Sequence, residues 1–233
     1  MKNTQLGHKL RTIFGQTCSK TYLVLLLGST ALIGSLILAI ALIEQPGSML
    51  TDDPAAITNQ PFYLGAFAHL GILLWCATAT ISFFTFALLK DVVNQSQSRR
   101  FFLSSGLITI LLLLDDLFLL HEYVLPNIFG IPQKLVYVIY AIIVAFYLIK
   151  FSKLIFKTNF ILLLLALALF AISIFNDQLT FFAEYNKDLH TVVEDGSKLL
   201  GIYCWLIYFA VVSLDKLKTI NFHQIESRQK ALR

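Results

Sequence analysis

The chain alternates between long apolar segments and short polar ones. Six apolar stretches come close to or exceed the roughly 20 residues that a helix needs to cross the hydrocarbon core of a bilayer. Residues 1–20 and 216–233, which flank them, are polar and basic. The pattern predicts an all-α polytopic membrane protein, with a single bundle of six transmembrane helices over residues 21–215. The expected spans are about 22–43, 62–89, 101–120, 135–149, 159–175 and 192–214.

Turn-forming residues separate these stretches. Proline and glycine interrupt residues 44–61, and Pro126, Gly130 and Pro132 interrupt residues 121–133, so we expect both segments to be loops. A third polar segment, residues 176–191, precedes the last apolar stretch. We expect the last helix to begin at about Val192.

Composition supports the membrane assignment. The chain is 57% hydrophobic and 14% charged, whereas a soluble domain is about 25% charged. The net charge of +4 is modest and segregated along the chain, so we do not expect a nucleic-acid partner. The three cysteines have no CxxC spacing, and neither a disulfide framework nor a cysteine zinc site is expected.

The distribution of charge predicts the topology. With both termini in the cytoplasm and six crossings, fifteen of the eighteen Lys and Arg residues fall on the cytoplasmic side. Eleven of the fourteen acids then fall on the outer side or in the outer halves of helices. We expect a multi-pass protein of the cytoplasmic (inner) membrane of a bacterium, with its polar chemistry at the outer face.

Asp115 and Asp116 interrupt the third apolar stretch, and His121 and Glu122 follow at its end. An Asp at the centre of a transmembrane helix is disfavoured by ~3 kcal/mol on insertion scales, and such residues are usually functional. Both carboxylates lie ~8–9 Å below the expected outer end of the helix. This pair is therefore the centre of the predicted site.

Other polar side chains are expected at the same depth. His190, Glu194 and Lys198 follow one another at intervals of four, so they share a helix face if the last helix extends back to His190. His69 lies about two turns into the second span from the same side.

Carboxylates and imidazoles in a helical bundle suit a divalent metal such as Zn, Mn or Fe. The candidate ligands, of which His69 is the weakest, are Asp115, Asp116, His121, Glu122, His190, Glu194 and His69. A His-Glu-x-x-His motif is absent.

Each polar residue also has a structural interpretation. Glu122 and His190 would be solvated residues at helix ends, and Glu194 would be an acid at a helix N-terminus that pairs with Lys198. His69 would be a hydrogen-bonded histidine of the bundle. The acidic pair is the hardest to explain in this way, because two adjacent carboxylates cannot both face lipid.

Three functions follow from this cluster. The first is a metal-dependent hydrolase of a lipid or lipid-linked substrate, with Asp115, Asp116, Glu194 and Lys198 as catalytic residues. The second is a proton- or cation-coupled transporter, although the inner half of the bundle offers few polar groups. The third is a non-enzymatic accessory or ligand-binding subunit. Membrane lipids are the expected partners, together with a protein partner or a second copy of the chain.

Overall fold

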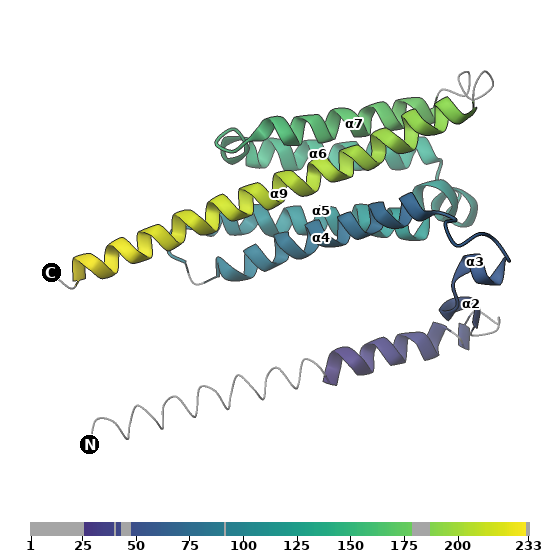
Figure 1. Ribbon diagram of the computed structural model, residues 1–233, viewed down its shortest axis with the longest axis horizontal. Coiled ribbons are helices and arrows are strands. Elements are labelled where there is room, and N and C mark those ends of the chain that lie inside the picture. The colour runs from purple at the N-terminus through teal and green to yellow at the C-terminus, as the bar shows by residue number, and fades with distance from the viewer. Residues whose placement is uncertain (1–25, 40, 43–47, 91, 179–186, 232–233) are drawn as a thin grey trace. The chain divides into compact units, whose positions relative to one another are not determined.

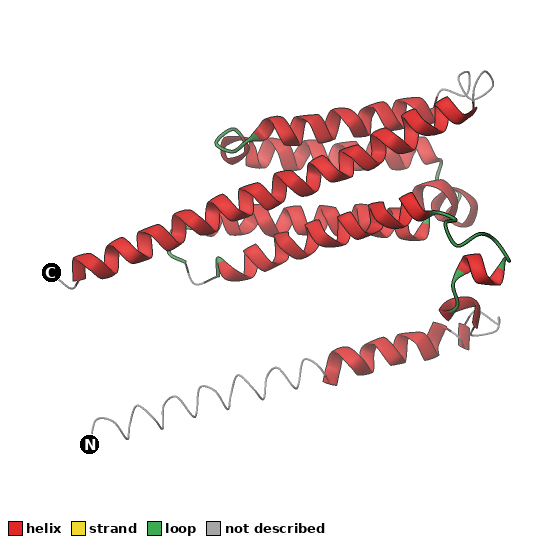
Figure 2. Cartoon of the chain, viewed as in Figure 1, coloured by secondary structure: helices red, strands yellow, loops and turns green. Residues whose placement is uncertain are grey.

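A computed structural model describes residues 26–39, 41–42, 48–90, 92–178 and 187–231, with side chains described as far as Ile220. The chain divides into two compact units, Met1–Leu64 and Gly65–Arg233. Every described element is helical (Figures 1 and 2), so the all-α class is confirmed.

The first unit contains the apolar helix Leu26–Ala39 and two short helices, α2 (Ser48–Thr51) and α3 (Pro54–Ile57). The side chain of Asp53 caps α3 by accepting a hydrogen bond of 2.8 Å from the backbone N–H of Ala55. The apolar helix falls within the predicted span 22–43, of which residues 22–25, 40 and 43 lie outside the described part of the chain.

The second unit contains the helices that position the site. They are α4 (Ala66–Leu88), α5 (Ser96–Phe118), the π-helix η1 (Leu120–Ile128), α6 (Gln133–Ile155), α7 (Phe160–Gln178) and α9 (Lys187–Ala231). In Figure 1, α9 runs along both α4 and α7, and α4 packs on α5. α6 contacts η1 and, over a small area, α5.

Five helices of this unit are long and apolar enough to cross a membrane, and Leu26–Ala39 is a shorter apolar helix. The five agree with predicted spans two to six, so a polytopic helical bundle is confirmed. α6 extends beyond the predicted end at residue 149 to Ile155 and includes Lys150 and Lys153. Their long side chains can reach the membrane surface from inside the helix.

Two predicted segments differ. Residues 121–133 do not form a simple loop, because Leu120–Ile128 is a π-helix that contains Pro126. The last helix begins at Lys187 and not at Val192. The earlier start places His190 inside the helix, where it shares a face with Glu194.

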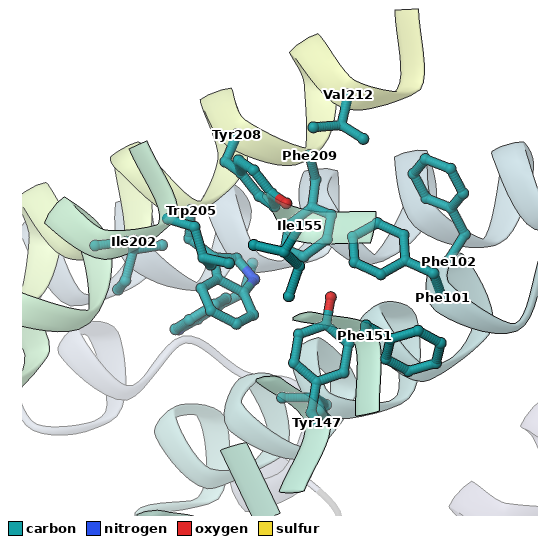
Figure 3. Packing of buried hydrophobic residues seen from close by; sticks show 14 of the residues in the cluster. Phe101, Phe102, Tyr147, Phe151, Ile155, Ile202, Trp205, Tyr208, Phe209 and Val212 are labelled. Atoms are coloured by element: carbon teal, nitrogen blue, oxygen red, sulfur yellow. The ribbon is translucent and has the colours of Figure 1, made fainter. Parts of the chain in front are cut away.

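The half of the bundle beyond the acidic pair is filled by aromatic side chains (Figure 3). Phe101 stacks against Tyr147 at 5.8 Å and lies 5.9 Å from Phe209 between ring centroids, which joins α5, α6 and α9. Hydroxyl groups tie the same helices together, because Ser105 and Tyr147 are hydrogen-bonded at 2.7 Å. Packing and such interhelical hydrogen bonds hold helices together in lipid, where the hydrophobic effect does not drive helices to associate.

Candidate functional site

The acidic pair lies where α5 ends. Leu119 closes α5 with a φ of 51°, in the left-handed region that side chains other than glycine rarely adopt. The chain then turns back, so that the backbone N–H of His121 donates to Asp115 Oδ1 at 3.0 Å. The π-helix that follows is a rare structure, frequently found at functional sites.

Asp115 is held by three donors. His121 Nδ1 donates to Oδ2 at 2.5 Å, and the Tyr140 hydroxyl donates to Oδ1 at 2.8 Å, in addition to the backbone N–H of His121. Asp115 and His121 are both 5% exposed. The carboxylate thus fixes the orientation of the imidazole ring, as in other aspartate–histidine pairs.

His121 also faces a second acid. Its Nε2 lies 3.3 Å from Glu122 Oε1, and its ring packs 5.1 Å from the ring of Tyr137. Burial alone would lower the pKa of His121, but the hydrogen bonds to Asp115 and Glu122 outweigh it and raise the pKa from 6.5 to about 9. The hydrogen bond from His121 lowers the pKa of Glu122. At neutral pH His121 is therefore a cation between two carboxylates.

Asp116 points to other helices. Its Oδ2 accepts a hydrogen bond of 2.8 Å from Trp75 Nε1 on α4, and its Oδ1 lies 2.7 Å from Lys198 Nζ on α9. The two adjacent carboxylates thus have separate partners on different helices. These contacts offset the cost of placing two acids at this depth.

Asp177, at the end of α7, accepts only from neutral groups. Its Oδ2 receives hydrogen bonds from Gln133 Nε2 at 3.0 Å, the Tyr137 hydroxyl at 2.9 Å and Gln178 Nε2 at 2.8 Å. No ion pair to Asp177 is present within the described residues.

Glu194 pairs with His190 one turn away, with 3.2 Å between Oε2 and Nδ1. His190 is also held by Asn176 of α7. Its Nε2 donates to the Asn176 carbonyl at 3.2 Å, and its own carbonyl accepts from Asn176 Nδ2 at 3.1 Å. His190 therefore joins α9 to α7.

A cavity of about 370 Å³ lies between α6 and the helices α5, α7 and α9. Its polar end is lined by six carboxylates, one lysine and one histidine: Asp115, Asp116, Glu122, Asp177, Glu194, Asp195, Lys198 and His121. Its other end is lined by aliphatic and aromatic side chains of α5, α6 and α7, among them Leu148 and Phe170. From Tyr137 to Leu148 the cavity follows α6 for ~16 Å, at 1.5 Å per residue.

The structure brings most of the predicted site residues together. Asp115, Asp116, His121, Glu122, Glu194 and Lys198 all line the cavity. His190 does not line it but pairs with Glu194, which does, whereas His69 is exposed on α4 and lies outside the lining.

The sequence interpretation missed Trp75, Tyr137, Tyr140 and Ser173, which also line the cavity. A signal was present for two of them, because Gln133, Tyr137 and Tyr140 recur on one face of an apolar helix. Trp75 and Ser173 stand alone in apolar runs and offer no comparable pattern.

A metal ion has no ready ligand set here. Within the described ranges no group of three or more His, Cys, Asp or Glu side chains is arranged to hold one. Both ring nitrogens of His121 already face carboxylates, and Asp116 already forms an ion pair with Lys198. Zn, Mn or Fe at this site thus stays a prediction.

Comparison with known proteins identifies the family. The family described as "Domain of unknown function (DUF8692)" matches residues 22–212. The chain belongs to this family, whose matched region includes every residue that lines the cavity. No curated protein and no solved structure matches the chain.

Proposed function

We propose that this protein is an integral membrane enzyme that hydrolyses a lipid or lipid-linked substrate bound in the cavity between α6 and α7. The observation that carries the proposal is the two-ended lining of the cavity. An aspartate–histidine pair lies at the polar end, and an apolar channel leads away from it.

The apolar end suits a hydrocarbon chain. Val144, Ala145 and Leu148 of α6 face Leu167 and Phe170 of α7 across it. A water-soluble substrate would gain nothing from the apolar lining, which follows α6 for ~10 Å from Ala141 to Leu148, whereas a chain is stabilised by contact along its whole length. Three alanines, Ala141, Ala145 and Ala171, are both exposed and part of the lining, so the cavity opens toward the lipid phase beside α6.

The polar end suits acid–base chemistry. Asp115 holds His121 Nδ1, and the protonated Nε2 faces the cavity beside Glu122. The leaving-group oxygen of the substrate would replace Glu122 beside His121 Nε2. It would receive the Nε2 proton as its bond to the rest of the substrate breaks. The freed Glu122 carboxylate would then take a proton from the water whose oxygen forms the new bond.

The packing of the inner half favours an enzyme over a transporter. The lining of α6 ends at Leu148, and Tyr147 beside it and Phe151 one turn further on are 2% and 3% exposed in the aromatic cluster. Their close packing closes this end of the cavity among the described helices. A substrate would enter and leave by the same end.

Turnover can be tested without knowledge of the substrate. The purified protein is reconstituted into vesicles made from a total lipid extract of the expression host, and the lipids are quantified by mass spectrometry over time. We expect the wild type to deplete one lipid class and release its hydrolysis product. His121→Gln should reduce that rate at least about a hundredfold, the range typical of general acid–base residues.

Two substitutions on α6 form a matched pair for this assay. Ala145→Phe fills the apolar end, whereas Ile142→Phe adds a phenylalanine at a position that is 62% exposed and outside the lining. Only Ala145→Phe should abolish turnover. Unchanged lipids with the wild type, or equal rates for wild type and His121→Gln, would overturn the proposal.

The metal-dependent form of this reaction has its own test. A metal bound at Asp115, Glu122 and His121 would require His121 to turn away from one of its two carboxylates. Metal content is measured by mass spectrometry on wild type and on Asp115→Asn/Asp116→Asn. Stoichiometric metal that is lost in the double variant would assign the catalytic water to the metal.

A further inference from the structure

The charges that line the cavity select among head groups. The polar end holds six carboxylates, but its two cations are already engaged. Lys198 pairs with Asp116, and His121 lies between Asp115 and Glu122. An anionic head group would therefore meet an excess of negative charge, with no free cation in the described lining to receive it.

Asp177 is the carboxylate best placed to hold a ligand cation. All three of its hydrogen-bond donors are neutral, so its charge is solvated but not balanced. It lies in the last turn of α7 and lines the cavity. A cation bound here would supply the charge-assisted contact that four other acids of the lining already have, namely Asp115, Asp116, Glu122 and Glu194.

Ser173 is a second, independent indication of a ligand. Its side chain lines the cavity and the residue is only 7% exposed, yet no partner for its hydroxyl is found in the described part of the chain. A hydroxyl at a cavity wall that has no partner in the protein can hydrogen-bond to a polar group of a ligand. Ser173 precedes Asp177 by four residues, hence it shares the same face of α7 and lies ~6 Å deeper.

We propose that the lipid in this cavity carries a protonated amine bound by Asp177 and, next to it, a hydroxyl or carbonyl group bound by Ser173. The inference rests on the proposed lipid site and adds its substrate class: a long-chain amino lipid, with its chain between α6 and α7. Phe170, one turn below Ser173, marks the start of the apolar lining on this helix.

The chain carries its own reporter for a binding test. It has two tryptophans, Trp75 and Trp205, and both line the cavity. A bromine at the end of a bound alkyl chain will therefore quench the intrinsic fluorescence. The probes are dodecylamine, dodecanol and dodecyl phosphate, each with a terminal bromine, titrated into the full-length protein in lipid nanodiscs.

We expect the amine to bind at least about tenfold more tightly than the alcohol, as a charge-assisted hydrogen bond would produce, and the phosphate to bind most weakly. Asp177→Asn should reduce the preference for the amine over the alcohol to less than about threefold. The affinity for the alcohol should not change, which also shows that the variant is folded. Ser173→Ala should weaken binding of the alcohol more than binding of the amine, because only the alcohol carries a hydroxyl group. Asp188→Asn, which removes an exposed acid outside the lining, is the matched control.

The outcomes separate this inference from the proposed function. Equal affinities for all three probes, or a preference for the phosphate, would overturn the amine head group while the lipid site stands. An amine preference that survives Asp177→Asn would overturn the role of Asp177. If no probe quenches either tryptophan, the lipid site itself is refuted.

Discussion

Asp115 and Asp116 are adjacent in sequence but belong to two different sets of contacts. Asp115 contacts His121 and Tyr140, and Asp116 contacts Trp75 and Lys198. Because neighbouring positions on a helix point ~100° apart, one pair of residues can contact three other helices at one level. An acidic pair inside a membrane span thus links several helices as well as forming part of a candidate site.

The charge on His121 makes stability depend on pH. Its folded-state pKa of about 9 exceeds the unfolded value of 6.5, so this stabilisation is complete below pH 6.5 and is lost as the pH rises through 9. The shift corresponds to at most about 3 kcal/mol. We expect the melting temperature of wild type in detergent to exceed that of His121→Gln by several degrees at pH 6, and by much less at pH 10.

Thermal unfolding of the two proteins across that range is the measurement. Taking the difference between them removes the contribution of the other titrating groups. A difference that stays constant from pH 6 to pH 10 would show that His121 is not charged in the folded protein.

The pair of Lys198 and Asp116 yields a double-mutant cycle. Lys198→Met leaves a carboxylate that is only 13% exposed without its cation, and we expect a loss of about 2 kcal/mol, less than for fully buried pairs because Lys198 is 34% exposed. Asp116→Asn/Lys198→Met should regain most of it, because the asparagine can still accept from Trp75. Asp116→Asn alone completes the cycle, and a loss in the double variant equal to the sum of the two single losses would mean that the pair contributes no coupling.

At the scale of elements, the junction between α5 and η1 builds the site. The left-handed Leu119 ends α5 and lets the next turn return His121 to Asp115. The sequence predicts that the span ends here, but it does not predict a π-helix, because no pattern of apolar residues distinguishes that turn from a loop with Pro126. The contact between Asp115 and His121 is therefore invisible until the chain is folded.

Leu119 provides a test of this strain. It is 50% exposed, so its side chain loses little packing when replaced, and a left-handed residue other than glycine costs about 1 kcal/mol. Leu119→Gly should match or exceed the wild type in thermal stability, while Leu119→Val should lower it. A destabilised glycine variant beside an unaffected valine variant would show that this backbone conformation is not adopted.

At the scale of the whole molecule, hydropathy predicts five of the described spans, because lipid requires long apolar helices. The depth of each charged residue follows from the order of the spans, which is why six predicted residues meet in one cavity. Aromatic residues could not be assigned in this way. Tyr137 and Tyr140 carry the same sequence signal as residues that anchor helices at the membrane surface.

The distribution of charge yields a topology prediction for the same bundle. The polar end of the cavity lies where α5 and α7 finish and α9 begins, and the basic residues Lys90, Arg99 and Lys216 lie toward the opposite end. We expect a fluorescent protein fused after residue 233 to fold and fluoresce in the cytoplasm of a bacterial host, and a secreted phosphatase fused there to be inactive. The reverse result would place the acidic cavity on the cytoplasmic side.

The most direct measurement of the central claim is native mass spectrometry of the protein released from membranes, with wild type, Ala145→Phe and Ile142→Phe compared. We predict one bound lipid on wild type and on Ile142→Phe, and none on Ala145→Phe, because a phenylalanine at residue 145 fills the apolar end of the cavity. Lipid retained equally by all three proteins, or absent from all three, would contradict the account.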